Sequence, residues 1–165
     1  MFQPGEYIHY ATSGLCRVEE ITTLQMSGAD SARLYYRLTP VYGHGSTIFT
    51  PVDNPKVAMR RAMTAKEADA LIASIPQIEE LAIPEEKHRE QSYKDALMSV
   101  DCRNWVQVIK TLYNRRQNRL AQGRKVTSTD ERYMRSAQER LYTELAVALG
   151  KEREEMEDYI SSVLD

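Results

Sequence analysis

The residues best able to carry chemistry in this chain are basic side chains gathered in one window. Between Asp101 and Asp130, the 28 intervening residues contain seven basic side chains and no acidic one. The whole chain has a net charge of −2, so the residues outside the window carry −9. A positive window on an acidic protein creates a local field that attracts polyanions. The seven residues are Arg103, Lys110, Arg115, Arg116, Arg119, Arg124 and Lys125.

Three arginines of this window have helical spacing. Arg115 and Arg119 lie one above the other on a helix, and Arg116 points about 100° away. The last two cations of the window follow in a predicted loop. This arrangement favours a surface that contacts the phosphate backbone of a nucleic acid. The alternative is a solvated face whose cations pair with acidic helices, and the charge pattern alone leaves both interpretations open. No base-reading motif is present, so sequence-specific recognition is not indicated.

Catalytic and metal-binding patterns are missing from the sequence. There is no Gly-rich phosphate loop, no dinucleotide fingerprint and no H-E-x-x-H motif. The histidines are scattered, and the carboxylates show no catalytic spacing. Cys16 and Cys102 have no His or Cys at ligand distance, which argues against a zinc site and a disulfide framework. We therefore expect no enzymatic activity, no metal and no cofactor.

Length and composition indicate a globular protein of one domain or two small ones. The 165 residues are 42% hydrophobic and 28% charged, which is usual for a soluble protein. The first residues lack the basic and apolar regions of a signal peptide, and no run approaches the roughly 20 apolar residues of a membrane span. We expect a cytoplasmic protein that does not associate with membranes.

The N-terminal third has the pattern of short strands. Four β-prone runs occur in the first 50 residues, separated by turns that contain glycine. The run after Gly14 alternates apolar and polar residues with a period of two. Such spacing predicts a small antiparallel sheet or barrel. The predicted strands cover residues 7–10, 15–21, 34–38 and 47–50.

After Pro55 the pattern becomes helical, so we divide the chain into domains 1–57 and 58–165. Two capping boxes, Thr64–Glu67 and Ser128–Glu131, predict helix starts, and Asp101 can cap another helix. Gly123 and Gly150 are suitable helix stops. The spacing of Trp105 with Ile109 and Leu112 places the tryptophan on an apolar stripe, which favours core packing over stacking on a ligand. The predicted helices cover residues 64–75, 84–100, 102–122, 128–149 and 151–164.

Segments of both halves carry a resemblance to a known family. The N-terminal ones are residues 5–10, 14–21, 35–38 and 48–52, and the helical ones are 93–97, 106–113, 128–132 and 144–146. In this order they resemble the CarD-like bacterial transcription regulators. The N-terminal resemblance is to the RNA-polymerase-interacting module of that family, which also occurs in transcription-repair coupling factor. The helical half is similar to the DNA-binding domain of the family, and the two together cover nearly the whole chain.

The resemblance implies an α+β fold, in which a small antiparallel β module of the Tudor/SH3-like barrel type precedes an all-α helical domain. It implies that the module docks on the β subunit of RNA polymerase, partly through a strand edge. The helical domain would contact promoter DNA at the upstream edge of the transcription bubble, with weak sequence preference. Such a protein modulates open-complex stability without catalysis, and we expect it to be a monomer.

The resemblance also assigns individual residues. Some family members wedge a tryptophan into the minor groove, and that position falls on Arg89 here. Lys94 and Arg132 match basic positions of the DNA-facing surface. Leu24 and Phe49 stand at positions that are basic on the polymerase-facing surface of some members, which implies a more apolar contact. The alternative function is a protein-interaction module without DNA contact, whose helices only rigidify the β module.

Overall fold

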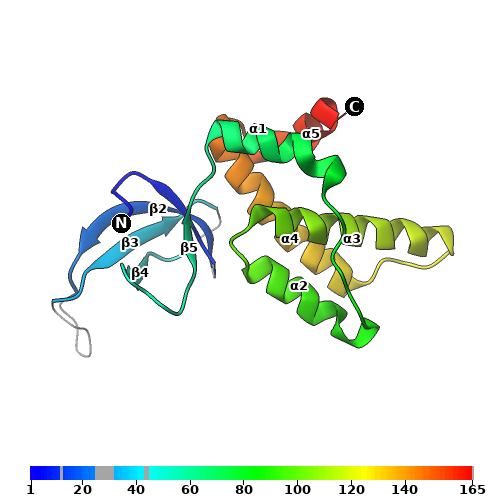
Figure 1. The fold of residues 1–165 in the computed structure, drawn as a ribbon, viewed down its shortest axis with the longest axis horizontal. Coiled ribbons are helices and arrows are strands. Elements are labelled where there is room, and N and C mark those ends of the chain that lie inside the picture. The colour runs from blue at the N-terminus through cyan, green and yellow to red at the C-terminus, as the bar shows by residue number, and fades with distance from the viewer. Residues whose placement is uncertain (12, 25–31, 43–44, 165) are drawn as a thin grey trace. The chain divides into compact units, whose positions relative to one another are not determined.

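The structure is a computed structural model that describes residues 1–11, 13–24, 32–42 and 45–164 (Figure 1). The chain divides into two compact units, Met1–Ala62 and Met63–Asp165. The first is a β-sheet and the second is helical, which confirms the α+β class. The division falls after Ala62, a few residues beyond the change of pattern that follows Pro55 in the sequence.

The first unit is a five-stranded antiparallel sheet with the strand order β4-β3-β2-β1-β5. Consecutive strands pair as antiparallel neighbours from β1 to β4. The long strand β2 carries a register shift between Val18 and Glu20, which bends it against β3. The strands are β1 Tyr7–Tyr10, β2 Gly14–Thr22, β3 Tyr35–Pro40, β4 Ile48–Pro51 and β5 Met59–Arg61.

One face of this sheet forms the core of the unit. Alternate residues of β2 and β3 point inward, so Cys16, Val18, Tyr36 and Leu38 are all buried. Ile8 of β1 completes the centre of the cluster. This alternation is the physical basis of the four predicted strands, which the structure contains with ends that differ by at most two residues.

The fifth strand has no counterpart in the sequence prediction. Residues 59–61 pair with β1, with Ile8 opposite Arg61 and Tyr10 opposite Met59. Because β5 belongs to the sheet, the first unit ends at Ala62 rather than at the predicted residue 57. A three-residue strand with two adjacent arginines shows no period-two pattern, so only its pairing with β1 reveals it.

The second unit consists of five α-helices and three short 3₁₀ turns within the described residues. In Figure 1, α3 and α4 are the two long helices, and they pack against each other. The short helix α2 packs on both, and α1 packs on α4 and α5. The helices are α1 Ala65–Ser74, α2 Arg89–Met98, α3 Cys102–Ala121, α4 Ser128–Leu149 and α5 Met156–Leu164.

Most predicted caps are present. Thr64 accepts a hydrogen bond from the Glu67 amide, and Asp101 accepts one from the Arg103 amide. Gly150 ends α4 with a left-handed backbone, at φ 64°. The predicted capping box at Ser128–Glu131 is wrong by one residue, because Thr127 is the N-cap of α4 and accepts from the amide of Asp130.

Trp105 lies in the core of the helical unit, as the periodicity predicts. Its side chain is fully buried, and its indole Nε1 donates a hydrogen bond of 3.1 Å to the Ser99 carbonyl. Leu112 and Val108 of the same helix are also buried, with Leu141 and Leu145 of α4. This packing fixes α3 against α4, so the side chains on the exposed faces of α3 are held in defined positions.

An extended segment, residues 78–83, runs along α3 and is fastened to it. Lys110 Nζ donates a hydrogen bond of 2.6 Å to the Ile78 carbonyl, and the Leu81 amide donates one of 2.9 Å to Thr111 Oγ1. These bonds satisfy backbone groups that have no helix or strand partner. The segment thereby separates two hollows on the surface of α3, which are described below.

Candidate nucleic-acid interface

The basic residues of the sequence window are held at one end of α3 by the loop that follows it. Gly123 adopts a positive φ of 71°, which turns the chain back at the helix end. The Arg124 amide then donates to the Arg119 carbonyl at 2.8 Å. Arg119 Nε in turn donates to the Lys125 carbonyl at 2.9 Å. Because of these bonds, three cations from the helix and the loop lie together.

Four arginines line one hollow of about 440 Å³ beside this loop. They come from α2, α3 and the loop, and Glu80 is the one acidic residue of the lining. The side chains of Asn114, Asn118 and Gln122 also face the hollow. Guanidinium and amide groups are donors that suit phosphate oxygens. The four arginines are Arg89, Arg115, Arg119 and Arg124.

Two of these arginines are engaged by carboxylates. Arg115 Nε donates to Asp130 Oδ2 at 2.8 Å, and its Nη1 donates to Glu86 Oε1 at 3.1 Å. Arg89 Nε lies 2.9 Å from the same Glu86 oxygen. Arg89 also donates to the Tyr93 hydroxyl at 2.8 Å. The alternative of cations paired with acidic helices therefore holds for this part of the window.

Glu86 is shared between the two arginines, and both arginines affect the pKa of its carboxyl group. The hydrogen bond from Arg89, with the further charge of Arg115, lowers the pKa of Glu86 below its usual value. The carboxylate is nonetheless exposed to solvent, so another anion can displace it from the two arginines. Glu86 occupies the position that an anion bound to Arg89 and Arg115 would take.

Lys94 and Arg132 lie at another carboxylate, Glu90. Arg132 Nη2 is 3.2 Å from Glu90 Oε1, and Lys94 Nζ is 3.9 Å from the same oxygen. The Tyr133 hydroxyl also donates to it, at 2.8 Å. These two basic residues do not line the hollow, so the structure divides the predicted DNA-facing residues into two groups.

Four further cations of the window form no ion pair with another described residue. They are Arg116, Arg119, Arg124 and Lys125. Arg116, Arg124 and Lys125 are exposed, whereas Arg119 is partly buried by its bond to the loop. Their positive charge is therefore not offset by a carboxylate of the described residues.

Sequence reasoning missed the polar lining, and it anticipated pairing with acidic helices without assigning a carboxylate to each arginine. Asn114, Asn118 and Gln122 recur every four residues, so helical spacing could have placed them beside Arg115 and Arg119. Nothing in the sequence predicts that Glu86 pairs with Arg115, because the two residues are far apart in the chain.

The predicted polymerase-facing residues lie in the β unit. Phe49 belongs to β4, an edge strand of the sheet, and its side chain is 45% exposed. Leu24 follows β2 and is half-buried, next to the undescribed residues 25–31. Sequence reasoning missed three further exposed apolar side chains that flank β3, namely Leu34, Val41 and Tyr42.

The described residues lack two features that would indicate other protein classes. No helix there is both long and apolar enough to cross a membrane. Within the same residues, no three His, Cys, Asp or Glu side chains are grouped so that they could hold a metal ion.

Comparison with known protein families shows to which family the chain belongs. Residues 2–63 match the CarD-like/TRCF RID domain, and residues 76–161 match the CarD C-terminal domain. The chain belongs to the CarD-like family. A comparison with curated proteins found no match.

A CarD-like protein is a transcription regulator that interacts with RNA polymerase, and the family is not a catalytic one. The two matched domains coincide with the β unit and with most of the helical unit. In this CarD-like chain the lone tryptophan, Trp105, is buried in the core. Trp105 is therefore not available to wedge into DNA.

Proposed function

We propose that this CarD-like protein binds the β subunit of RNA polymerase with its β unit and contacts promoter DNA with its helical unit. The DNA contact would lie near the upstream edge of the bubble and would change the stability of the open complex. The protein would act as a monomer in the bacterial cytoplasm. The observation that carries the DNA contact is the hollow lined by four arginines.

The chemistry of this hollow supports contact with the DNA backbone. Arg119 and Arg124 have no recorded acidic partner among the described residues, and Arg116 and Lys125 extend the charge onto the neighbouring surface. The side-chain amides of Asn118 and Gln122 add neutral donors. Contacts of this kind fix the position of a protein on a duplex but carry little sequence information. They agree with a regulator that has weak sequence preference.

Arg89 supports a second contact of a different kind. It stands at the position where some family members have a wedging tryptophan, and its guanidinium is held by Glu86 and Tyr93. An oriented guanidinium can enter a narrow minor groove, where the negative potential is strongest. We therefore propose that Arg89 makes an electrostatic contact in place of an apolar wedge.

The β unit offers an edge and an apolar side chain for the polymerase. β4 is an edge strand, so one side of its backbone has no strand partner in the described sheet. Exposed strand edges are used for pairing with a strand of another protein. Phe49 lies on this strand and is 45% exposed, and we propose that it packs on the β subunit together with Leu24.

The test is retention of purified core RNA polymerase by the full-length protein and by two variants. Phe49→Asp alters the proposed docking strand, and Met98→Asp changes an exposed apolar residue of the helical unit as the matched control. We expect Phe49→Asp to lose the polymerase and Met98→Asp to retain it. Equal retention by both variants would contradict docking through β4.

The alternative, a protein-interaction module without DNA contact, is favoured by one observation. Arg89, Arg115 and Arg132 are paired with carboxylates of the protein itself. The two functions differ in their response to charge reversal. Arg116→Glu with Arg119→Glu should shorten the open-complex lifetime if the helical unit contacts DNA. If the open-complex lifetime is unchanged while polymerase is still bound, the protein is an interaction module without DNA contact.

A further inference from the structure

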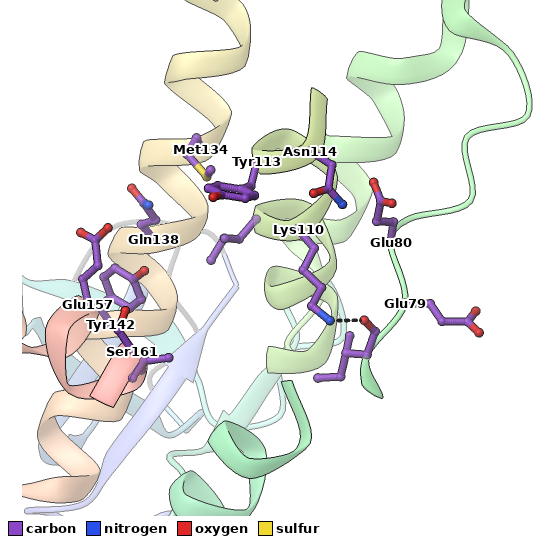
Figure 2. A pocket seen from close by; sticks show the side chains of 13 residues that line it. Glu79, Glu80, Lys110, Tyr113, Asn114, Met134, Gln138, Tyr142, Glu157 and Ser161 are labelled. Carbon is purple, nitrogen blue, oxygen red and sulfur yellow. Dashed lines mark hydrogen bonds between the residues drawn. The ribbon is translucent and has the colours of Figure 1, made fainter. Parts of the chain in front are cut away.

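A second hollow lies on the helical unit, between α3, α4, α5 and residues 78–80 (Figure 2). We call it the α3–α4–α5 groove. Its volume is about 650 Å³, which is larger than that of the arginine-lined hollow. None of the predicted DNA-binding or polymerase-binding residues lines it.

The groove and the arginine-lined hollow are neighbours on α3, because Glu80 and Asn114 line both. Ile109 and Tyr113 line only the groove, whereas Arg115 and Arg119 line only the arginine-lined hollow. The apolar floor of the groove is therefore separate from the arginines. The inference that follows stands whether or not the helical unit binds DNA.

The floor of the groove is apolar and includes an exposed aromatic side chain. Ile109 of α3, Met134 of α4 and Ile160 of α5 are partly buried beneath it. Tyr113 is 53% exposed, and its ring lies beside Met134 in Figure 2. An exposed tyrosine over an apolar hollow gives a surface on which an apolar side chain can be buried.

The rim of the groove is acidic. Glu79, Glu80 and Glu157 line it, and none of them forms an ion pair with another described residue. The one cation of the lining, Lys110, is directed to the Ile78 carbonyl. The groove lining thus has a net charge of −2, whereas the lining of the neighbouring arginine-lined hollow is basic.

The carboxylate of Glu157 and the aromatic ring of Tyr142 are neighbours in the groove (Figure 2). Burial raises the pKa of Tyr142, and the Glu157 carboxylate raises it further. A cation near Glu157 would meet both the carboxylate and the face of an aromatic ring, a combination that binds ammonium and guanidinium groups.

We propose that the α3–α4–α5 groove docks a basic peptide segment of a partner protein, with apolar residues between basic ones. The apolar side chains would pack on Ile109, Met134 and Ile160. The flanking basic side chains would pair with Glu157 at one end and with Glu79 and Glu80 at the other. The charge of the groove excludes a nucleic-acid strand as the occupant.

The test is an NMR titration of the full-length, ¹⁵N-labelled protein with the peptide acetyl-Arg-Arg-Leu-Leu-Arg-Arg-amide. We expect amide shifts concentrated at residues 109–113, 134–142 and 157–161. The double variant Glu79→Gln/Glu157→Gln should weaken binding about fivefold. The matched control Glu131→Gln/Glu155→Gln removes the same charge from exposed positions outside the groove and should leave binding unchanged. Tyr113→Ala should also weaken binding.

Four results would overturn the proposal. The two double variants could weaken binding equally, which would show a nonspecific charge effect. The peptide acetyl-Glu-Glu-Leu-Leu-Glu-Glu-amide could bind equally well. Tetramethylammonium chloride could give the same shifts with equal affinity, which would make the groove a small-cation site. Concentration-dependent shifts in the same residues without any peptide would make a second copy of the chain the occupant.

Discussion

Asp130, at the start of α4, accepts a 2.8 Å hydrogen bond from Arg115 of α3. The Asp130 side chain is only 9% exposed, so this is a largely buried ion pair between two helices. Arg115 was predicted as a DNA-binding residue, yet its geometry also gives it a structural task. The role of each basic residue therefore has to be tested by stability as well as by DNA binding.

Replacing Arg115 should destabilise the helical unit. Arg115→Gln leaves the Asp130 carboxylate buried without its cation, and we expect a loss of about 1–3 kcal/mol in the free energy of unfolding. Arg116→Gln removes the same charge from an exposed site and should change stability by less than about 0.5 kcal/mol. Urea denaturation of both variants measures the difference. Equal stability of the two would show that the Arg115–Asp130 pair contributes nothing.

Removing the charge of Glu86 should strengthen DNA binding. The carboxylate engages Arg89 and Arg115 and competes with phosphate for them. Glu86→Gln should raise the affinity for a promoter duplex about two- to fivefold at low salt, because surface ion pairs are weak. Glu85→Gln is the matched control, since Glu85 pairs with Lys87 and His88. Fluorescence anisotropy with a labelled duplex measures the DNA affinity of both variants. Weaker DNA binding by Glu86→Gln would show that the Glu86 carboxylate does not compete with phosphate.

The unpaired cations should set the salt dependence of DNA binding. Each cation that contacts a phosphate releases about one counterion, so losing it lowers the slope of log affinity against log salt by about 1. We expect that change for Arg119→Gln and for Arg124→Gln. Arg103→Gln, at the other end of α3, should leave the slope unchanged. An identical slope for all three variants would mean that the arginine-lined hollow does not touch DNA.

Stability should fall in alkaline solution because of Cys16. Burial raises the pKa of this thiol from 9.0 to about 11. Above pH 9 the unfolded chain loses the proton while the folded chain keeps it, so folding weakens from about pH 9 to about pH 11. The loss is on the order of 2 kcal/mol for a shift of this size.

Denaturation of the wild type and of Cys16→Ala at a series of pH values measures this effect. The variant is less stable at neutral pH because it loses buried volume, but the difference from the wild type should shrink above pH 9. A constant difference up to pH 11 would show that Cys16 does not titrate in this range.

Local sequence signals were sufficient for most of the fold. The alternation in β2 and the helical stripe around Trp105 arise from burial of one face, so they are visible in the sequence. The N-cap of α4 is Thr127, one residue before the predicted capping box at Ser128–Glu131. Asp130, whose amide donates to Thr127, also pairs with Arg115 of α3, and that contact is tertiary.

The candidate site was predictable only in part. Helical spacing placed Arg115 and Arg119 on one face of α3, where the structure has them. The spacing could not show that Glu86 neutralises Arg115, or that Arg89 reaches the same hollow from α2. Such contacts depend on how helices pack, and no local pattern encodes the partner of a long side chain.

The pairing of β5 with β1 has a consequence for folding during synthesis. The first strand of the sheet gains its outer neighbour only when residues 59–61 have left the ribosome. The helical unit likewise needs the end of the chain, because its first helix, α1, packs on its last two helices, α4 and α5. Contacts between distant parts of a chain slow folding. A nascent chain arrested before residue 59 should therefore present an incomplete sheet to chaperones and proteases.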